Sequence, residues 1–468
     1  MNKFRTATVC KRTAKICCRC ITPPAAKPHH NILKRGIFAI QGFVWQSMVI
    51  SMELQTYNIK SGVNLHYIHT TKFKTTTLGI YIHLPLTKET VTKDSLLSMV
   101  IKRACPLYPT TRVLAEQLDY LYGADFETNV RKKGDCHIIS ANFSFLNEKY
   151  ITSHEPILNK VLSMAESIVL KQDGFDDDIV AQEKENLKQE ISAQKNDKRS
   201  YAMKRCVEEM CKNEPYGIPR LGVLEDIDGI TSDELYRHYK EHVMQGIFDV
   251  FVVGDVDIDS VEMRVKQMFA AVNVKSGCYC ESTVVKTVGE VKNITEMEHV
   301  QQGKLSMGFR TKIEATDDKY PAVVMYNAIL GGGLFSKLFN NVREKLSLAY
   351  YASSSVDYLK GIMNINSGIE VKNYQLCYDE ILTQMDDMKN GKISEQEFTA
   401  GRLGVVNNIK SLTDNPFSLE DYYLSRFIIG KVIDIDDLAA MMERVTVEQV
   451  VEVARLIELD TVYFLCGE

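Results

Sequence analysis

The sequence predicts an α+β fold made of two related halves, each an antiparallel sheet with helices packed on one face. Strand-like runs with alternating apolar residues are interspersed with longer segments that have apolar residues at helical spacing. The halves also end alike, because Thr231 precedes Gly254 by 23 residues and Thr446 precedes Gly467 by 21, each with an apolar run before the glycine. We interpret this as a duplication of units of about 200 residues, much longer than the period of a solenoid repeat.

The first half opens with strands. Alternating apolar residues around a Ser-Gly turn predict a hairpin at 54–68, and a third strand follows at 76–85. Helical spacing of apolar residues predicts helices at 91–103, between Pro109 and Gly123, and at 149–170, 177–212 and 233–243. The remaining strands of this half are predicted at 125–132, 136–145 and 248–253.

The second half repeats this order. Its strands are predicted at 304–310, 350–357 and 363–370, and its helices at 320–330, 338–345, 373–389 and 394–412. The segment 276–298 is polar and lacks a helical pattern, which is typical of a linker. The predicted domains are therefore 52–275 and 299–468.

The first 51 residues differ from the rest of the chain. They hold nine of the 56 basic residues and none of the 61 acidic ones, which leaves 47 basic residues and a net charge of −14 for the remainder. We expect this basic leader to be disordered, or to precede a true start at Met48 or Met52. A targeting segment would have a similar composition. Cys17-x-x-Cys20 with the following His-His pair is a further alternative, although its spacing fits no standard zinc site.

Composition limits the class of protein and its partners. The chain is 45% apolar and 25% charged, which is ordinary for a globular protein, and no apolar run approaches the roughly 20 residues of a membrane helix. The acidic body argues against nucleic-acid binding. The cysteines beyond the leader are scattered, which is typical of reduced thiols. We therefore expect a cytoplasmic protein that binds neither nucleic acid nor membrane.

Two segments carry a resemblance to a known family. In the first, from Thr92 to Pro109, a helix follows the third strand and ends near a Tyr-Pro turn. The second is Leu330-Gly-Gly-Gly-Leu-Phe-Ser-Lys-Leu-Phe-Asn-Asn-Val-Arg-Glu-Lys-Leu-Ser-Leu-Ala-Tyr350. Over 52–468 the chain resembles the pitrilysin/insulinase-like metallopeptidases, the inverzincins, and in particular a non-catalytic bacterial branch associated with aminopentanol modification of elongation factor P. The resemblance implies two insulinase-like domains arranged as a clamshell.

The metal-binding positions of that family are changed in this chain. In active members the first helix carries His-x-x-Glu-His; the histidines and a distant glutamate bind zinc, and the inner glutamate activates a zinc-bound water. Ser95, Ser98 and Met99 stand at the three motif positions, and Glu190 matches the distant glutamate. A hydroxyl stays protonated near neutral pH and a thioether binds zinc weakly. The resemblance therefore implies a degenerate site with no metal or other cofactor, although Glu190 could equally be a charge on a solvated helix face.

A His-x-x-Glu-His sequence does occur elsewhere, at His238-Tyr-Lys-Glu241-His242. On a helix this spacing puts both imidazoles on one face. The motif comes about 140 residues later than the family's metal helix, in the closing helix of the first half. We interpret it as a coincidence, and the alternative is an active zinc metallopeptidase that uses His238, Glu241 and His242.

Arg343 and Tyr350 match a pair that, by the resemblance, binds the substrate backbone across the chamber. A planar guanidinium and a rigid hydroxyl both suit polar backbone groups. The alternative is a surface arginine and a tyrosine that begins a strand.

The predicted function is that of a catalytically inactive subunit. It would bind a peptide or protein substrate and pair with a catalytic zinc-peptidase sister chain as a heterodimer. A homodimeric peptide-binding scaffold is the second alternative, beside the active peptidase.

Overall fold

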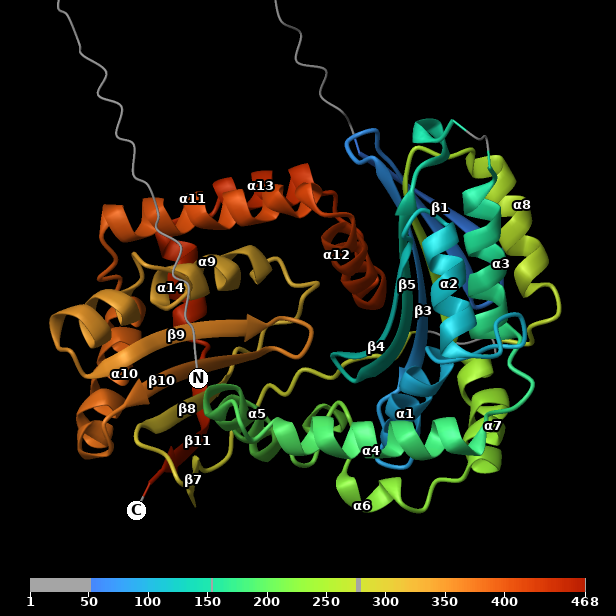
Figure 1. Ribbon diagram of the computed structural model, residues 1–468. Coiled ribbons are helices and arrows are strands. Elements are labelled where there is room, and N and C mark those ends of the chain that lie inside the picture. The colour runs from blue at the N-terminus through green and yellow to red at the C-terminus, as the bar shows by residue number, and fades with distance from the viewer. Residues whose placement is uncertain (1–51, 153–154, 275–278, 468) are drawn as a thin grey trace, which may run out of the picture. The chain divides into compact units, whose positions relative to one another are not determined.

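The computed structural model describes residues 52–152, 155–274 and 279–467 (Figure 1). The described residues belong to one compact unit, Ile50–Glu468. The basic leader at 1–51, with Cys17 and Cys20, lies outside the described residues, so the expectations for it stay predictions.

The first half contains a six-stranded sheet in the order β1-β2-β6-β3-β5-β4. Neighbouring strands are antiparallel, except that β2 and β6 run parallel. The strands are β1 (Glu53–Lys60), β2 (Val63–His69), β3 (Thr75–Pro85), β4 (Asp125–Lys133), β5 (Cys136–Leu146) and β6 (Ile247–Gly254). The predicted hairpin is β1 and β2, with Gly62 at φ 75° in its turn.

The helices of this half follow the predicted order, and two details differ. They are α1 (Val91–Ile101), α2 (Thr111–Tyr120), α3 (Ile157–Leu170), α4 (Asp177–Ala193), α5 (Lys198–Met210), α6 (Leu224–Ile227), α7 (Ser232–Glu241) and α8 (Ile258–Phe269). The single helix expected at 177–212 is two helices, because the Asp197 side chain accepts hydrogen bonds from the backbone N–H groups of Arg199 and Ser200 and begins α5. Helices α6 and α8 were not predicted.

The second half repeats the first. Its five-stranded sheet has the order β7-β11-β8-β10-β9, which corresponds to β2-β6-β3-β5-β4, again with one parallel pair, β7 and β11. Thr231 and Thr446 cap the equivalent helices α7 and α14, as their matching positions predict. The strands are β7 (Lys292–Met297), β8 (Gly303–Arg310), β9 (Ala349–Asp357), β10 (Ile362–Ile369) and β11 (Glu458–Cys466). The helices are α9 (Tyr320–Leu330), a π-helix at Leu338–Lys345, α10 (Tyr374–Lys389), α11 (Glu395–Ser411), α12 (Pro416–Ile429), α13 (Ile435–Glu443) and α14 (Val447–Ala454).

Strand β7 lies inside the segment expected as a linker, 276–298. Its register places Thr461 of β11 beside Lys292 and Cys466 beside Met297, so this part of the segment belongs to the second sheet. The sequence does not predict this strand, because it lies at a sheet edge and contains only two apolar residues, Ile294 and Met297.

Each sheet also receives a helix from the other half. Helix α12 packs on β3 and β6 of the first sheet, and α5 packs on β8, β10 and β11 of the second (Figure 1). These helices are equivalent, since each follows a 17-residue helix of its own half. Along β6, Phe248 and Val250 lie in the core of the first half. Phe251 and Val253 lie in the core formed with the second half, so β6 is buried on both faces.

The two-sheet α+β architecture that the sequence predicts is thus confirmed. Among the described helices, none combines the length and the apolar character needed to cross a membrane.

Candidate functional site

Helix α1 carries the changed metal positions, and its serine hydroxyls bond to the backbone. Ser95 is buried, and its Oγ donates to the carbonyl of Arg220 at 3.2 Å. Ser98 Oγ donates to the carbonyl of Ser95 at 2.9 Å, and the carbonyl of Ser98 accepts from Thr128 Oγ1 at 2.5 Å. Met99 packs against the apolar core of the first half. The three side chains therefore support the fold of α1.

Glu190 lies near these positions, and Arg220 connects it to them. The Glu190 side chain is exposed, and its Oε1 is 3.8 Å from Nη2 of Arg220. The same guanidinium donates from Nη1 to the carbonyl of Val130 at 2.9 Å, while the carbonyl of Arg220 accepts from Ser95. The Arg220 guanidinium thus lies beside Glu190, whose match to the distant glutamate of the family stays a prediction. A hydroxyl, a thioether and this paired carboxylate do not fit a zinc ion.

The His-x-x-Glu-His motif of α7 lies against α1, the helix with the replaced metal positions. The sequence does not predict this contact. His238 Nε2 is 2.7 Å from Oδ1 of Asp94, the residue that precedes Ser95 on α1. His137 of β5 approaches the other carboxylate oxygen, with Nδ1 3.0 Å from Oδ2. The motif is thus distant from the changed positions in sequence but adjacent to them in space, since α7 packs on α1. Its interpretation as a coincidence stays a prediction.

Asp94 is the group at the centre of this cluster. Burial by itself would raise the pKa of its carboxyl, but hydrogen bonds to His137 and His238 outweigh burial and hold the pKa below its ordinary value. Asp94 is thus a buried carboxylate. Glu241, the acid within the motif, is exposed instead. Sequence reasoning singled out neither Asp94 nor His137, because nothing local marks them as partners of α7.

Arg343 and Tyr350 are both accessible. Arg343 is on the π-helix Leu338–Lys345, where its guanidinium lies 4.7 Å from the ring centre of Phe339 and its side chain is 42% exposed. Tyr350 lies on β9, which is at one edge of the second sheet, and is 55% exposed. The predicted binding role of the pair stays a prediction.

A cavity of about 520 Å³ lies between residues of the two halves. Lys132 and Arg220 of the first half line it together with Ser355 and Asp357 of the second. Lys132 Nζ donates to the carbonyl of Tyr216 at 2.7 Å and lies over that residue's ring, and burial lowers the pKa of Lys132 to about 8. Because Arg220 also contacts Ser95 and Glu190, the cavity adjoins the changed metal positions.

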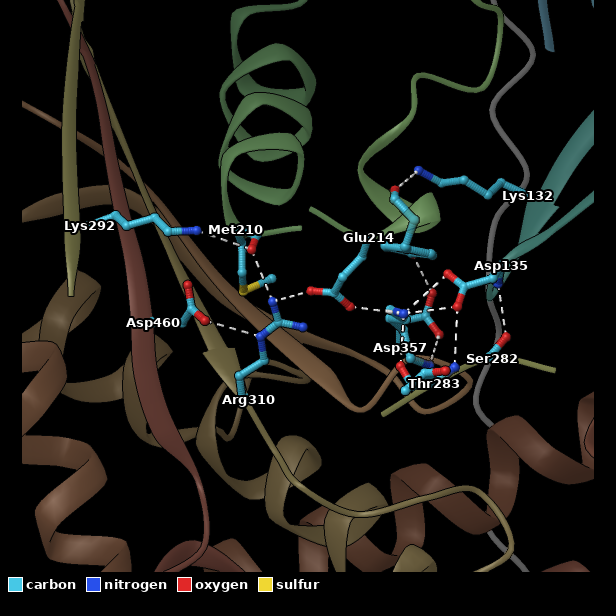
Figure 2. A network of polar contacts seen from close by, with 12 residues as sticks. Lys132, Asp135, Met210, Glu214, Ser282, Thr283, Lys292, Arg310, Asp357 and Asp460 are labelled. Carbon is cyan, nitrogen blue, oxygen red and sulfur yellow. Dashed lines mark hydrogen bonds and ion pairs between the residues drawn. The ribbon is translucent and has the colours of Figure 1, made fainter. Parts of the chain in front are cut away.

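A buried polar network holds the two halves together beside this cavity (Figure 2). Glu214 of the first half accepts from Arg310 Nη2 at 2.6 Å and lies 2.9 Å from Lys360 Nζ, both from the second half. Lys360 also donates to both carboxylate oxygens of Asp135, and Arg310 Nε donates to Asp460. These ion pairs fix the turn between β4 and β5, and the segment after α5, against the second half.

Comparison with known proteins agrees with this geometry. Residues 229–404 match the family described as peptidase M16 inactive domain. The probable inactive metalloprotease YmfF of Bacillus subtilis is 38% identical over 410 residues, which cover 87% of this chain and 96% of that protein. An uncharacterized zinc protease of Rickettsia felis is 22% identical, over 62% of this chain and 70% of its own length.

Solved structures show the same fold. The crystal structure of a conserved protein from Enterococcus faecalis has a TM-score of 0.82 at 31% identity, covering 89% of this chain and 99% of its own. A peptidase M16 inactive domain from Pseudomonas fluorescens has a TM-score of 0.73 at 17% identity, with 89% and 98% covered. Given this similarity, and with Ser95, Ser98 and Met99 at the metal positions, the chain belongs to the peptidase M16 family as a non-catalytic member.

Proposed function

We propose that this chain binds an extended peptide between its halves without cleaving it, as the partner of a catalytic M16 chain. The observation that carries the proposal is the cavity of about 520 Å³, which residues of both halves line beside the changed metal positions. The catalytic side chains are replaced while a peptide-sized space next to them is kept. Loss of activity alone would give no reason to keep such a space open.

The second half offers groups suited to a peptide backbone. Among the described strands, β9 pairs with β10 on one side. On its other side the Ser354 N–H already donates to the carbonyl of Gly331 at 3.1 Å, so an added strand could pair with the part of β9 before Ser354. Tyr350 lies at the start of β9, and Arg343 presents a partly exposed guanidinium on the preceding π-helix. Both side chains can reach a bound backbone without disturbing the core.

Peptide binding is tested by substitution of this pair in the full chain. Arg343→Ala should weaken binding of an unstructured peptide by about 1.5–3 kcal/mol, the range for a hydrogen bond to a charged group, and Tyr350→Phe by about 0.5–1.5 kcal/mol. Arg402→Ala is a matched control, since Arg402 also lies over a neighbouring ring, that of Phe398. Fluorescence anisotropy gives the affinities. Equal losses of peptide affinity for Arg343→Ala and Arg402→Ala would contradict a specific role of Arg343 in peptide binding.

The partner is tested by co-purification. Tagged protein from the native host should retain an M16 chain with an intact His-x-x-Glu-His, and the pair should cleave peptides that neither chain cleaves alone. A homodimer that binds peptide without such a chain would identify a scaffold instead. We also propose a cytoplasmic location, which the free thiols of all seven described cysteines fit. The association with elongation factor P modification stays a prediction.

A further inference from the structure

Three metal-binding groups meet where α7 packs on α1. One nitrogen from each of His238 and His242 and one carboxylate oxygen of Asp94 lie within 4.8 Å of one another. The two imidazoles are stacked with ring centres 4.9 Å apart. We propose that Asp94, His238 and His242 bind one divalent transition-metal ion, with zinc as the preferred ion.

The donor set fits this class of ion. Two imidazoles and one carboxylate are ligands that zinc accepts at about 2.0–2.2 Å, which corresponds to ligand atoms about 3.3 Å apart in a tetrahedral site. His238 Nε2 and Asp94 Oδ1 are already 2.7 Å apart, so small side-chain rotations are enough to admit the ion. His242 caps the C-terminus of α7, where the helix dipole favours a cation. The three protein ligands leave the fourth position for water.

His137 and Arg220 provide the outer layer of the site. His137 Nδ1 is 3.0 Å from the second oxygen of Asp94, and its Nε2 is 3.1 Å from the carbonyl of Arg220. A ligating carboxylate held by a second residue in this way is typical of metal sites, because the outer contact fixes the orientation of the ligand. Asp94 and His137 are both fully buried on α1 and β5, so the carboxylate is fixed before an ion arrives.

This site differs from the one that the motif would suggest by itself. In His-x-x-Glu-His the glutamate would act as the base, but Glu241 is exposed and does not belong to the cluster. The third ligand comes instead from α1, so the ion would tie α7 to α1. A cavity of about 640 Å³ reaches the residues beside the ligands, Lys93 next to Asp94 and Glu234 one turn before His238.

Metal content and cobalt spectroscopy on the full chain test the proposal. Chelator-treated protein dialysed against Zn(II) should retain one equivalent, and Co(II) should give the intense visible bands of a tetrahedral site without a thiolate charge-transfer band. His238→Gln and His242→Gln should abolish retention. His137→Gln should raise the zinc Kd about 10–100-fold, the usual effect of losing an outer partner.

Two variants serve as controls. His69→Gln removes another His–Asp pair, with Asp255 at 3.4 Å on the surface, and should leave zinc content unchanged, as should Glu241→Gln. Thermal unfolding of the metal-free variants shows which are folded, and partly exposed His242 gives the milder of the two ligand substitutions. Zinc should raise the unfolding temperature of the wild type but not of His242→Gln. Absence of bound zinc in the wild type, equal zinc in folded His242→Gln, or a thiolate band that assigns the metal to cysteines would each overturn the proposal.

Discussion

Lys360→Met should strongly destabilise the contact between the two halves. The Lys360 side chain is fully buried; its Nζ lies 3.0 and 3.1 Å from the two oxygens of Asp135, 2.9 Å from Glu214 and 2.8 Å from the carbonyl of Thr283. Methionine keeps the apolar stem but removes the charge that faces the carboxylates of Asp135 and Glu214. Breaking a buried ion pair costs about 3–5 kcal/mol. Glu214 keeps its hydrogen bond from Arg310, so we expect the lower end of this range, a decrease of about 3 kcal/mol in the free energy of unfolding.

The loss should also depend on pH. Burial alone would raise the pKa of Glu214, but hydrogen bonds from Arg310 and Lys360 lower it below its ordinary value. A lowered pKa adds stability above the ordinary glutamate pKa of about 4.3, and that stability is lost as the pH falls through the folded-state pKa. The difference between wild type and Lys360→Met should therefore be largest near neutral pH and shrink below about pH 4.

Urea unfolding at pH 7 and at about pH 3, below the ordinary glutamate pKa of about 4.3, measures both effects. Lys392→Met is the matched control, because Lys392 pairs with Asp387 at 2.7 Å but is 69% exposed, and exposed pairs contribute about 0–1 kcal/mol. Two results would each refute the conclusion that the buried polar network holds the two halves together. One is that Lys360→Met is no less stable than Lys392→Met, and the other is that its loss of unfolding free energy is the same at both pH values.

Three further predictions concern other contacts. Glu420 of α12 accepts from Thr77 and Tyr81 of the first sheet, and burial raises its pKa to about 7, so its contribution to stability falls as the pH rises from about 4.3 to 7. Urea unfolding at pH 5 and pH 8 should show that Glu420→Gln removes about 3 kcal/mol of this pH dependence; an unchanged pH profile would contradict it. Gly79→Ala should cost about 1–3 kcal/mol in thermal unfolding, because an added Cβ would lie 2.4 Å from Glu420 Oε2, whereas Gly404→Ala has open space and should be neutral or stabilising. Arg343→Ala and Tyr350→Phe should change the unfolding free energy by less than about 0.5 kcal/mol, since both side chains are exposed, and a larger loss in urea would assign them to packing.

The order of elements could be predicted because the signals are local. Alternating residues mark β3 and β5, helical spacing marks α9 and α11, and the threonines at 231 and 446 mark equivalent helix starts. The replaced side chains at Ser95, Ser98 and Met99 are likewise visible in one short segment. Such local signals are sufficient to predict the duplication of the chain into two related halves, the two sheets and the loss of the family's metal ligands.

Other features depend on residues that are distant in the sequence. Asp94, His137 and His238 meet only because α1, β5 and α7 pack together, and Arg220 reaches Ser95 from a segment 125 residues away. The exchange of α5 and α12 between the sheets has the same origin. A periodic pattern shows which face of a helix or strand is apolar. It does not show which other element packs on that face, because this depends on the packing of the whole chain. The positions at which buried charged groups meet therefore depend on tertiary structure. Both the candidate metal site and the buried polar network between the halves arise in this way.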